Sequence, residues 1–164
     1  MFREMRRKKQ LLTKEETIAI LEKGTSGVLA LLGDEDYPYA VPISYCYCDN
    51  KLYFHGAKTG HKIDAIRKCE KASFCVIDQD QVVPDEYTTY FRSAIAFGKI
   101  HVIEDEQEKR AAIAKLAEKY TPDNKEGRER EIDRKYRILC MIELDIEHLT
   151  GKEAIELCGQ KKSF

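Results

Sequence analysis

The sequence predicts an α+β protein of mainly β structure, in which an antiparallel β-barrel is decorated by helices. Three observations lead to this prediction. About six segments show strand-like patterns, whereas helical periodicity is found in three places. These segments do not follow the regular strand–helix–strand order that a parallel sheet requires. Residues 89–104 also form an unusually long strand pattern, which is typical of a curled sheet or barrel rather than a flat sheet.

Length and composition indicate one globular domain spanning residues 1–164. Hydrophobic residues make up 43% of the chain and charged residues 35%. A net charge of −1 provides no overall field for nucleic acid or a membrane surface. Because no apolar run is long enough to span a bilayer and the N-terminus lacks the apolar centre of a signal peptide, we expect a cytoplasmic protein with neither kind of partner.

The chain opens with a basic arm at residues 1–10, in which residues 2–9 carry five basic side chains. We interpret it as a solvated arm, with a phosphate or nucleic-acid contact as the alternative. The sequence Thr-Lys-Glu-Glu at 13–16 is a capping-box pattern that predicts a short helix. Ile18 and Leu21 should mark its buried side, and Gly24 fits its end.

Two strands joined by a turn should follow. Residues 27–32 are an apolar strand, and Gly-Asp-Glu-Asp at 33–36 predicts the turn. From 39 to 48 the residues alternate by size, which gives one bulky, core-facing side and one small side able to accept something flat. The bulky side consists of Tyr39, Val41, Ile43, Tyr45 and Tyr47, and the small side of Ala40, Pro42, Ser44, Cys46 and Cys48. Pro42 cannot donate to a ladder, so this strand should lie at an edge or a bulge.

The next segment combines a hairpin with a helix start. A turn at 49–50 leads into a strand over 51–55, with Leu52 and Phe54 facing inward. After Gly56, Ala57 and Gly60, the sequence His61-Lys62 opens a helical pattern. Free N–H groups at a helix start attract anions, and Lys62 adds a positive charge. The pattern suits a flat ring that carries a phosphate, although a hairpin followed by an ordinary amphipathic helix remains the alternative.

The second half of the chain continues the barrel pattern. Residues 72–78 should form a strand, and residues 79–89, with Pro84 and few apolar anchors, a long loop of the kind that is often functional. In the long strand at 89–104, Phe91, Ile95, Phe97 and Ile103 share a face, and Gly98 marks a bend or a close approach.

Two helical segments and a last strand should complete the chain. A helix is predicted over 106–120, with Ile113 and Leu116 buried and Pro122 ending it. Residues 125–134 are so highly charged that a helix there should be a solvated flap. A strand over 137–149 should place Ile138, Cys140, Ile142, Leu144 and Ile146 inward, and residues 150–164 form a C-terminal tail.

The six cysteines lie mostly in apolar runs, where a free thiol behaves as a small hydrophobic group. Cys46 and Cys48 are the only close pair. A structural zinc site would require a second pair at matching spacing, so no metal site is predicted.

Several motifs in this order resemble the nitroimidazole-resistance (Nim) family, which belongs to the pyridoxamine 5'-phosphate oxidase-like, flavin-binding split barrels. The resemblance covers nearly the whole chain and lies in the runs MFREMRR at 1–7, YPYAVPISY at 37–45, YFHGA at 53–57, GHKIDAI at 60–66, FCV at 74–76, YFRSAIAFG at 90–98 and LTGK at 149–152. It implies a six-stranded antiparallel split barrel with one FMN-binding domain. It also implies a homodimer with FMN at the subunit interface, and an exposed apolar strand face would favour the same assembly.

The expected activity is that of an FMN-dependent oxidoreductase, because the resemblance implies a flavin that takes electrons from NAD(P)H and passes them to a small-molecule substrate. Some family members are credited with reducing nitroimidazole drugs, so nitro compounds are candidate acceptors. Two alternatives remain: a flavin-binding sensor or storage module without turnover, and a nucleic-acid-binding barrel, which the charge balance disfavours.

The expected cofactor-binding residues follow from the strand, the helix start and the resemblance. They are Val41, Pro42, Ile43, Ser44, Tyr45, His55, Gly56, Ala57, His61, Lys62 and Lys152. His61 is also the candidate catalytic residue, with a surface histidine as the alternative. His55 could face the ligand or the outer surface of the barrel. His101 and His148 are not part of any recognisable group of catalytic or ligand-binding residues in the sequence, so both are interpreted as structural.

Overall fold

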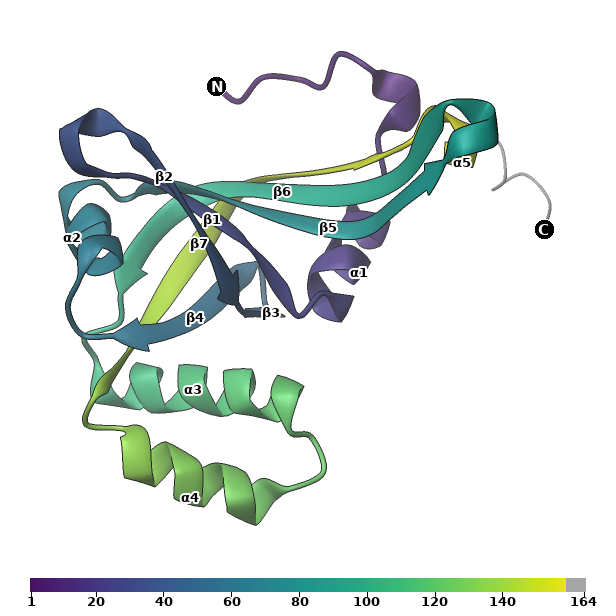
Figure 1. Cartoon of the computed structure of the whole chain (residues 1–164). Coiled ribbons are helices and arrows are strands. Elements are labelled where there is room, and N and C mark those ends of the chain that lie inside the picture. Colours follow the sequence, from purple (N-terminus) through teal and green to yellow (C-terminus); the bar gives the residue numbers. More distant parts are fainter. Residues whose placement is uncertain (159–164) are drawn as a thin grey trace.

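The computed structural model describes residues 1–158, which form one antiparallel sheet with helices around it (Figure 1). The sheet order is β2-β1-β5-β6-β7-β4-β3. The strands are β1 Ser26–Leu32, β2 Pro38–Ser44, β3 Cys46–Cys48, β4 Lys51–Ala57, β5 Lys71–Val83, β6 Thr88–Val102 and β7 Leu139–Glu153. The helices are α1 Lys14–Lys23, α2 His61–Lys68, α3 Glu106–Tyr120, α4 Lys125–Lys135 and α5 Ile155–Cys158, and the 3-10 turns are η1 Lys8–Gln10, η2 Asp34–Asp36 and η3 Pro84–Glu86.

The sheet closes into a barrel at Tyr45, where one extended segment changes partners. β2 pairs with β1, whereas β3, which follows after this single residue, pairs with β4. The two outermost strands of the sheet order are therefore consecutive in the chain. Counted as one strand, they give the six-stranded antiparallel barrel that the sequence predicted. The Tyr45 ring is fully buried, and its hydroxyl donates to the carbonyl of Leu21 at 2.8 Å.

A hydroxyl from α3 bonds to the backbone at this break. The Tyr120 Oη accepts from the Tyr45 amide at 3.0 Å, lies 3.1 Å from the Tyr45 carbonyl oxygen and also contacts the Thr25 carbonyl. Strand partners cannot reach these groups at a corner, and leaving them buried without a partner would be unfavourable. Tyr120 therefore satisfies the backbone where the ladder is interrupted.

The barrel interior is filled by bulky side chains from β4 and β5 facing small ones from β6. Phe74 lies between Tyr45 and Phe54, with ring centroids 4.7 and 5.1 Å away. Ala94 and Ala96 are fully buried on the inner face of β6, whereas Ile95 and Phe97 face outward. The bulky side of residues 94–97 is thus the outer one, because the barrel beside the three aromatic rings has little room there. Farther along β6, Ile100 faces inward and is buried.

A second apolar cluster lies outside the barrel, between the sheet and α3. Figure 1 shows α3 between β4 and α4. Ile113 and Leu116 are buried there, as predicted, against residues of β4 and β7. α4 packs on α3 through Ile132, which is also buried. Arg110 of α3 joins the two helices by ion pairs to α4 with N–O distances of 2.6 Å. The segment predicted as a solvated flap is therefore a helix with a buried anchor.

Several local predictions are confirmed. Thr13 and Glu16 form both bonds of a capping box, and the helix ends before Gly24. On that helix, however, Thr17 and Ile20 are buried with Leu21, and Ile18 is only half-buried. The turn at 49–50 has left-handed dihedrals at both residues. At Gly98 the register shifts, and a Cβ would collide with the carbonyl oxygen of Asp145.

The long loop predicted at 79–89 is wrong. β5 continues to Val83, turns through η3 and pairs back along β6 from Thr88. A register shift between Ile77 and Gln79 marks where the hairpin leaves the barrel. In Figure 1 the hairpin projects away from the barrel. Because it has no core to face, it lacks the apolar alternation that identifies a strand.

The last strand is also displaced relative to the prediction. Cys140, Ile142, Leu144 and Ile146 face inward as expected, but Ile138 precedes the strand and is 70% exposed. β7 continues to Glu153 and is followed by α5, so the predicted tail at 150–164 begins too early. Residues 159–164 of that tail lie outside the described residues.

Candidate functional site

The start of α2 is open to an external acceptor. Gly60 precedes the helix with φ +116°, and no side chain caps it. The amides of Ile63 and Asp64 bond to the Gly60 carbonyl at 2.9 and 3.1 Å, which leaves the earlier amides of the first turn pointing outward. A Cβ at Gly60 would meet no atom within 4 Å. This loop therefore offers uncapped N–H groups at an accessible helix start, an arrangement that favours anions.

Lys62 extends from this first turn back over β4. A Cβ built on Gly56 would lie 3.3 Å from the Lys62 Nζ, so the absence of a side chain leaves space beside the ammonium group. Lys62 is half-buried, and burial lowers its pKa, while the nearby Cys140 thiol acts in the opposite direction. No carboxylate of residues 1–158 forms an ion pair with it. A partly desolvated cation without a carboxylate partner among the described residues is suited to an anionic group.

His61 points away from Lys62, toward the loop between β1 and β2. Its ring stacks on Tyr39 with centroids 4.1 Å apart and planes at 19°. Its Nε2 lies 3.7 Å from a carboxylate oxygen of Asp34. The predicted catalytic candidate is thus a half-exposed ring held between β2 and η2. Two adjacent residues of one helical turn consequently face two different structures.

His55 and Ala57 lie on the outer face of β4, opposite Leu52 and Phe54. His55 lines a cleft of about 250 Å³ between β4 and the α3–α4 pair. Burial lowers the pKa of His55, and the charges of Lys62 and Lys135 lower it further. The structure therefore brings His55, Gly56 and Lys62 together at the end of β4, with His55 favoured in its neutral form.

The predicted ring-binding strand, β2, has one hydrogen-bonded neighbour, β1, among the described strands. Val41 and Ile43 pack against the core, while Pro42 is exposed and Ser44 is half-buried. The other edge of β2 is open, so its backbone groups are available to a ligand. Tyr45 is different, because Tyr120 already occupies its amide and carbonyl groups.

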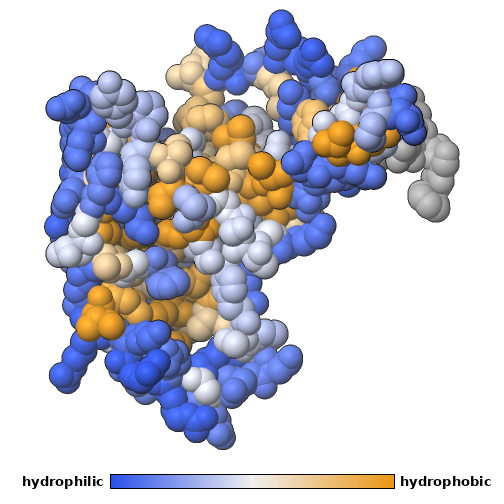
Figure 2. Space-filling view, in the orientation of Figure 1, coloured by the Kyte–Doolittle hydropathy of each residue, from blue (hydrophilic) through white to orange (hydrophobic). Residues whose placement is uncertain are grey.

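The outer face of the sheet carries an apolar patch, which we define by Val28, Ala30, Ile95, Phe97 and the small residues of β2. The ladder registers place Val28 level with Pro42 and Cys75, and Cys75 level with Ile95. Figure 2 shows apolar side chains gathered where β1, β2, β5 and β6 cross. Val28, Ile95 and Phe97 remain 40%, 36% and 37% exposed. The small side of β2 is therefore part of a larger apolar surface.

Lys152 is a predicted site residue that the structure places far from Lys62. It lies near the end of β7, where its Nζ is 5.4 Å from the ring centroid of Phe91. Cys140, beside Lys62, lies near the start of the same strand. Lys152 and Lys62 are thus at opposite ends of β7 and do not form one site within a single copy.

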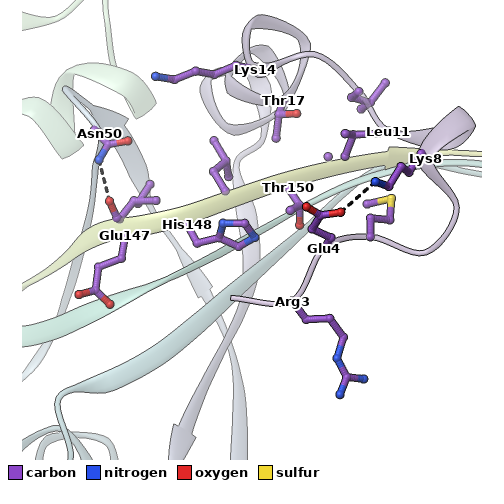
Figure 3. Close-up of a pocket in the computed structure, with 15 residues that line it drawn as sticks. Arg3, Glu4, Lys8, Leu11, Lys14, Thr17, Asn50, Glu147, His148 and Thr150 are labelled. Carbon is purple, nitrogen blue, oxygen red and sulfur yellow. Dashed lines mark hydrogen bonds and ion pairs between the residues drawn. The ribbon is translucent and has the colours of Figure 1, made fainter. Parts of the chain in front are cut away.

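A second, larger cleft was not expected from the sequence. It measures about 760 Å³ and separates the N-terminal arm from β7 and α1 (Figure 3). Arg3, Lys8 and Lys14 contribute cations, and Glu4 pairs with Lys8 at 2.9 Å. Phe2 stacks on His148 with centroids 4.7 Å apart, so the arm is anchored at its beginning. Nothing in the sequence pattern couples these residues, because they lie almost 150 positions apart.

Comparison with known proteins identifies the family. Residues 13–153 match the family model described as pyridoxamine 5'-phosphate oxidase, so the chain belongs to that family. No curated protein matches significantly. A candidate 5-nitroimidazole antibiotic resistance protein from Bacteroides thetaiotaomicron has a similar fold, with a TM-score of 0.75 and 24% identity over 87% of this chain and 86% of that one.

Two flavoproteins share the fold at lower identity. An FAD-binding protein from Mesorhizobium loti is 22% identical over 88% of this chain and 97% of that one, with a TM-score of 0.63. An FAD- and haem-binding protein from Mycobacterium smegmatis is 20% identical over 95% of this chain and 81% of that one, with a TM-score of 0.72. Among the residues that the structure describes, no helix combines the length and apolar character needed to cross a bilayer.

Proposed function

We propose that this protein is an FMN-dependent oxidoreductase that reduces a small organic acceptor, with nitro compounds as candidates, using electrons from NAD(P)H. The observation that carries the proposal is the position of Lys62. Its ammonium group lies over Gly56, beside an uncapped helix start and without a carboxylate partner among the described residues. These groups together fit the terminal phosphate of FMN, which carries close to two negative charges.

The open edge of β2 would hold the flavin ring. Backbone groups between Val41 and Ser44 are available there, and the Ser44 hydroxyl adds a further donor or acceptor. Tyr45 supports the strand through its buried ring rather than through its backbone. When bound, the flavin supplies the electron-transfer chemistry, and these residues bind and orient it. The FAD-binding relatives make FAD the alternative cofactor.

The active form in this proposal is a homodimer with FMN at the interface. The apolar patch on β1, β2 and β6 offers a surface that a second copy could cover. Lys152 supports this arrangement, because it lies too far along β7 from Lys62 to reach the same flavin within one copy. A second copy could bring its own Lys152 to that flavin.

Replacing Lys62 with Ala tests the phosphate site. Hydrogen bonds to charged groups contribute roughly 1.5–3 kcal/mol, so FMN should bind about one to two orders of magnitude more weakly. Riboflavin, which lacks the phosphate, should bind both proteins about equally. Titration of the flavin-free protein with each flavin measures this difference, and added salt should narrow it for FMN.

Lys71→Ala is a matched control, because this exposed lysine at the start of β5 follows the end of α2 that is opposite to Lys62. It should leave both flavin affinities unchanged. An equal loss of FMN and riboflavin affinity in Lys62→Ala would reject the phosphate assignment. Stopped-flow reduction of the bound flavin by NAD(P)H separates an enzyme from a module that only binds flavin.

A further inference from the structure

α2 is held against the β1–β2 loop at both of its ends. At its start, the His61 ring stacks on Tyr39, and the Nε2 atom would lie 3.1 Å from a Cβ built on Gly33. At its end, the Lys68 ammonium donates to the Gly33 carbonyl at 3.3 Å and pairs with Asp36 at 3.1 Å. These contacts connect the helix that begins at His61 with the strand that begins at Pro38.

The two connected elements are the two halves of the proposed flavin site. Tyr39 lies two residues before the segment of β2 assigned to the ring, and His61 immediately precedes Lys62, which is assigned to the phosphate. A ligand that bridges both halves requires them at a fixed separation, and misplacement by even 1 Å weakens such binding. The stacked rings of His61 and Tyr39 form a direct side-chain contact between these two halves.

We infer that His61 is a positioning residue, whose imidazole ring clamps the start of α2 onto Tyr39 and thereby sets the spacing between the phosphate-binding and ring-binding parts of the flavin site. The inference rests on the proposed function and assigns His61 a role other than catalysis. The role depends on an aromatic ring at this position and not on a hydrogen bond to the flavin. Offset ring stacking of this kind contributes a modest but measurable energy.

The experiment compares His61→Ala with His61→Phe by titrating FMN and riboflavin. The quantity of interest is the ratio of the riboflavin and FMN dissociation constants, which reports the phosphate contribution. His61→Ala should lower this ratio by about three- to tenfold, the size expected for a lost aromatic pair. His61→Phe retains a ring over Tyr39 and should keep the ratio within about twofold of wild type. In a double-mutant cycle, Tyr39→Leu should have little further effect once His61 is Ala.

A second measurement uses no flavin. Hydrogen exchange at the amides of residues 61–64 should accelerate in His61→Ala and remain close to wild type in His61→Phe. Lys68→Met is the matched control, because it releases the other end of α2 and should leave the ratio unchanged.

The alternative outcomes are distinct. If Ala and Phe lower the ratio equally, the imidazole itself contacts the phosphate and the positioning role is wrong. The role is also wrong if neither variant changes the ratio, or if the effects of His61 and Tyr39 are additive. If the wild-type protein binds neither flavin, the proposed function fails, while the exchange measurement still shows whether the clamp holds the helix start.

Discussion

At the scale of single residues, His55 lines the cleft beside α3 and also lies within reach of the positive charges of Lys62 and Lys135. Burial, followed by the charges of Lys62 and Lys135, lowers its pKa in the folded protein. An unperturbed histidine titrates near 6.5, so the unfolded chain binds the proton at a higher pH than the folded protein does. The favourable contribution of neutral His55 is therefore complete above about pH 6.5 and is lost as the pH falls through the folded-state value.

Two results should follow for His55. The free energy of unfolding should decrease as the pH is lowered from about 7 to about 5.5, and His55→Gln should make this decrease shallower. Urea titrations at each pH measure this. An NMR titration provides the check on its cause: the His55 midpoint should rise when Lys62 is replaced by Ala, because one repelling charge is removed. A midpoint that does not move would show that Lys62 does not influence His55.

Residue types and spacing were sufficient to predict part of the local geometry on which the proposed site rests. Gly56 and Lys62 were assigned from the strand end and the helix start, and the structure places the Lys62 ammonium over Gly56. The directions of adjacent side chains could not be predicted, so His61 and Lys62 were expected at one ligand but face different structures. The contact between the N-terminal arm and His148 depends on chain folding over long sequence separations, which local patterns do not encode.

At the scale of elements, Tyr120 joins α3 to the corner between β2 and β3. Its hydroxyl lies within hydrogen-bond distance of the amide and carbonyl of Tyr45 and of the carbonyl of Thr25. Tyr120→Phe would leave the part-buried amide and carbonyl of Tyr45 without that partner, and an unsatisfied buried group costs about 1–3 kcal/mol. The Thr25 carbonyl is exposed, so water can replace its bond. We expect the free energy of unfolding to fall by about 2 kcal/mol, measured by urea denaturation.

Tyr136→Phe provides the comparison, because the Tyr136 hydroxyl makes an exposed bond to the Glu106 carbonyl at 2.9 Å. Water can replace that bond, so the loss should be below about 0.5 kcal/mol. Equal losses in the two variants would show that the corner does not depend on Tyr120.

Elements were predictable where one face of a segment meets a core. α3 has the predicted bounds, and the inward residues of β7 from Cys140 to Ile146 are those expected. The β5–β6 hairpin was missed because it projects from the barrel and has no buried face from residue 79 onward. At residues 94–97 of β6 the larger side chains face outward, whereas Ile100 faces inward, so the sequence pattern identified the strand without revealing which side was the interior.

At the scale of the whole molecule, the apolar patch leads to a prediction about assembly. We expect a homodimer in sedimentation equilibrium at micromolar concentration. Ile95→Lys should yield a folded monomer, because Ile95 is exposed in the centre of the patch and a charge there opposes burial. Ile138→Lys is the control, since Ile138 is 70% exposed away from the patch and should leave the mass unchanged. A wild-type monomer that still binds flavin would contradict the dimer.

The change of partners at Tyr45 also determines how the molecule is protected from aggregation. β2 and β3 are the first and last strands in the sheet order, and Tyr45 is the single residue that connects them. A circular permutant with new termini at the Asp49–Asn50 turn would keep that connection. A permutant cut at Tyr45 would retain every ladder but would let the unpaired edges of β2 and β3 move apart, and such edges are templates for joining other chains. Solubility of this fold therefore depends on one point of covalent continuity rather than on the number of hydrogen bonds in the sheet.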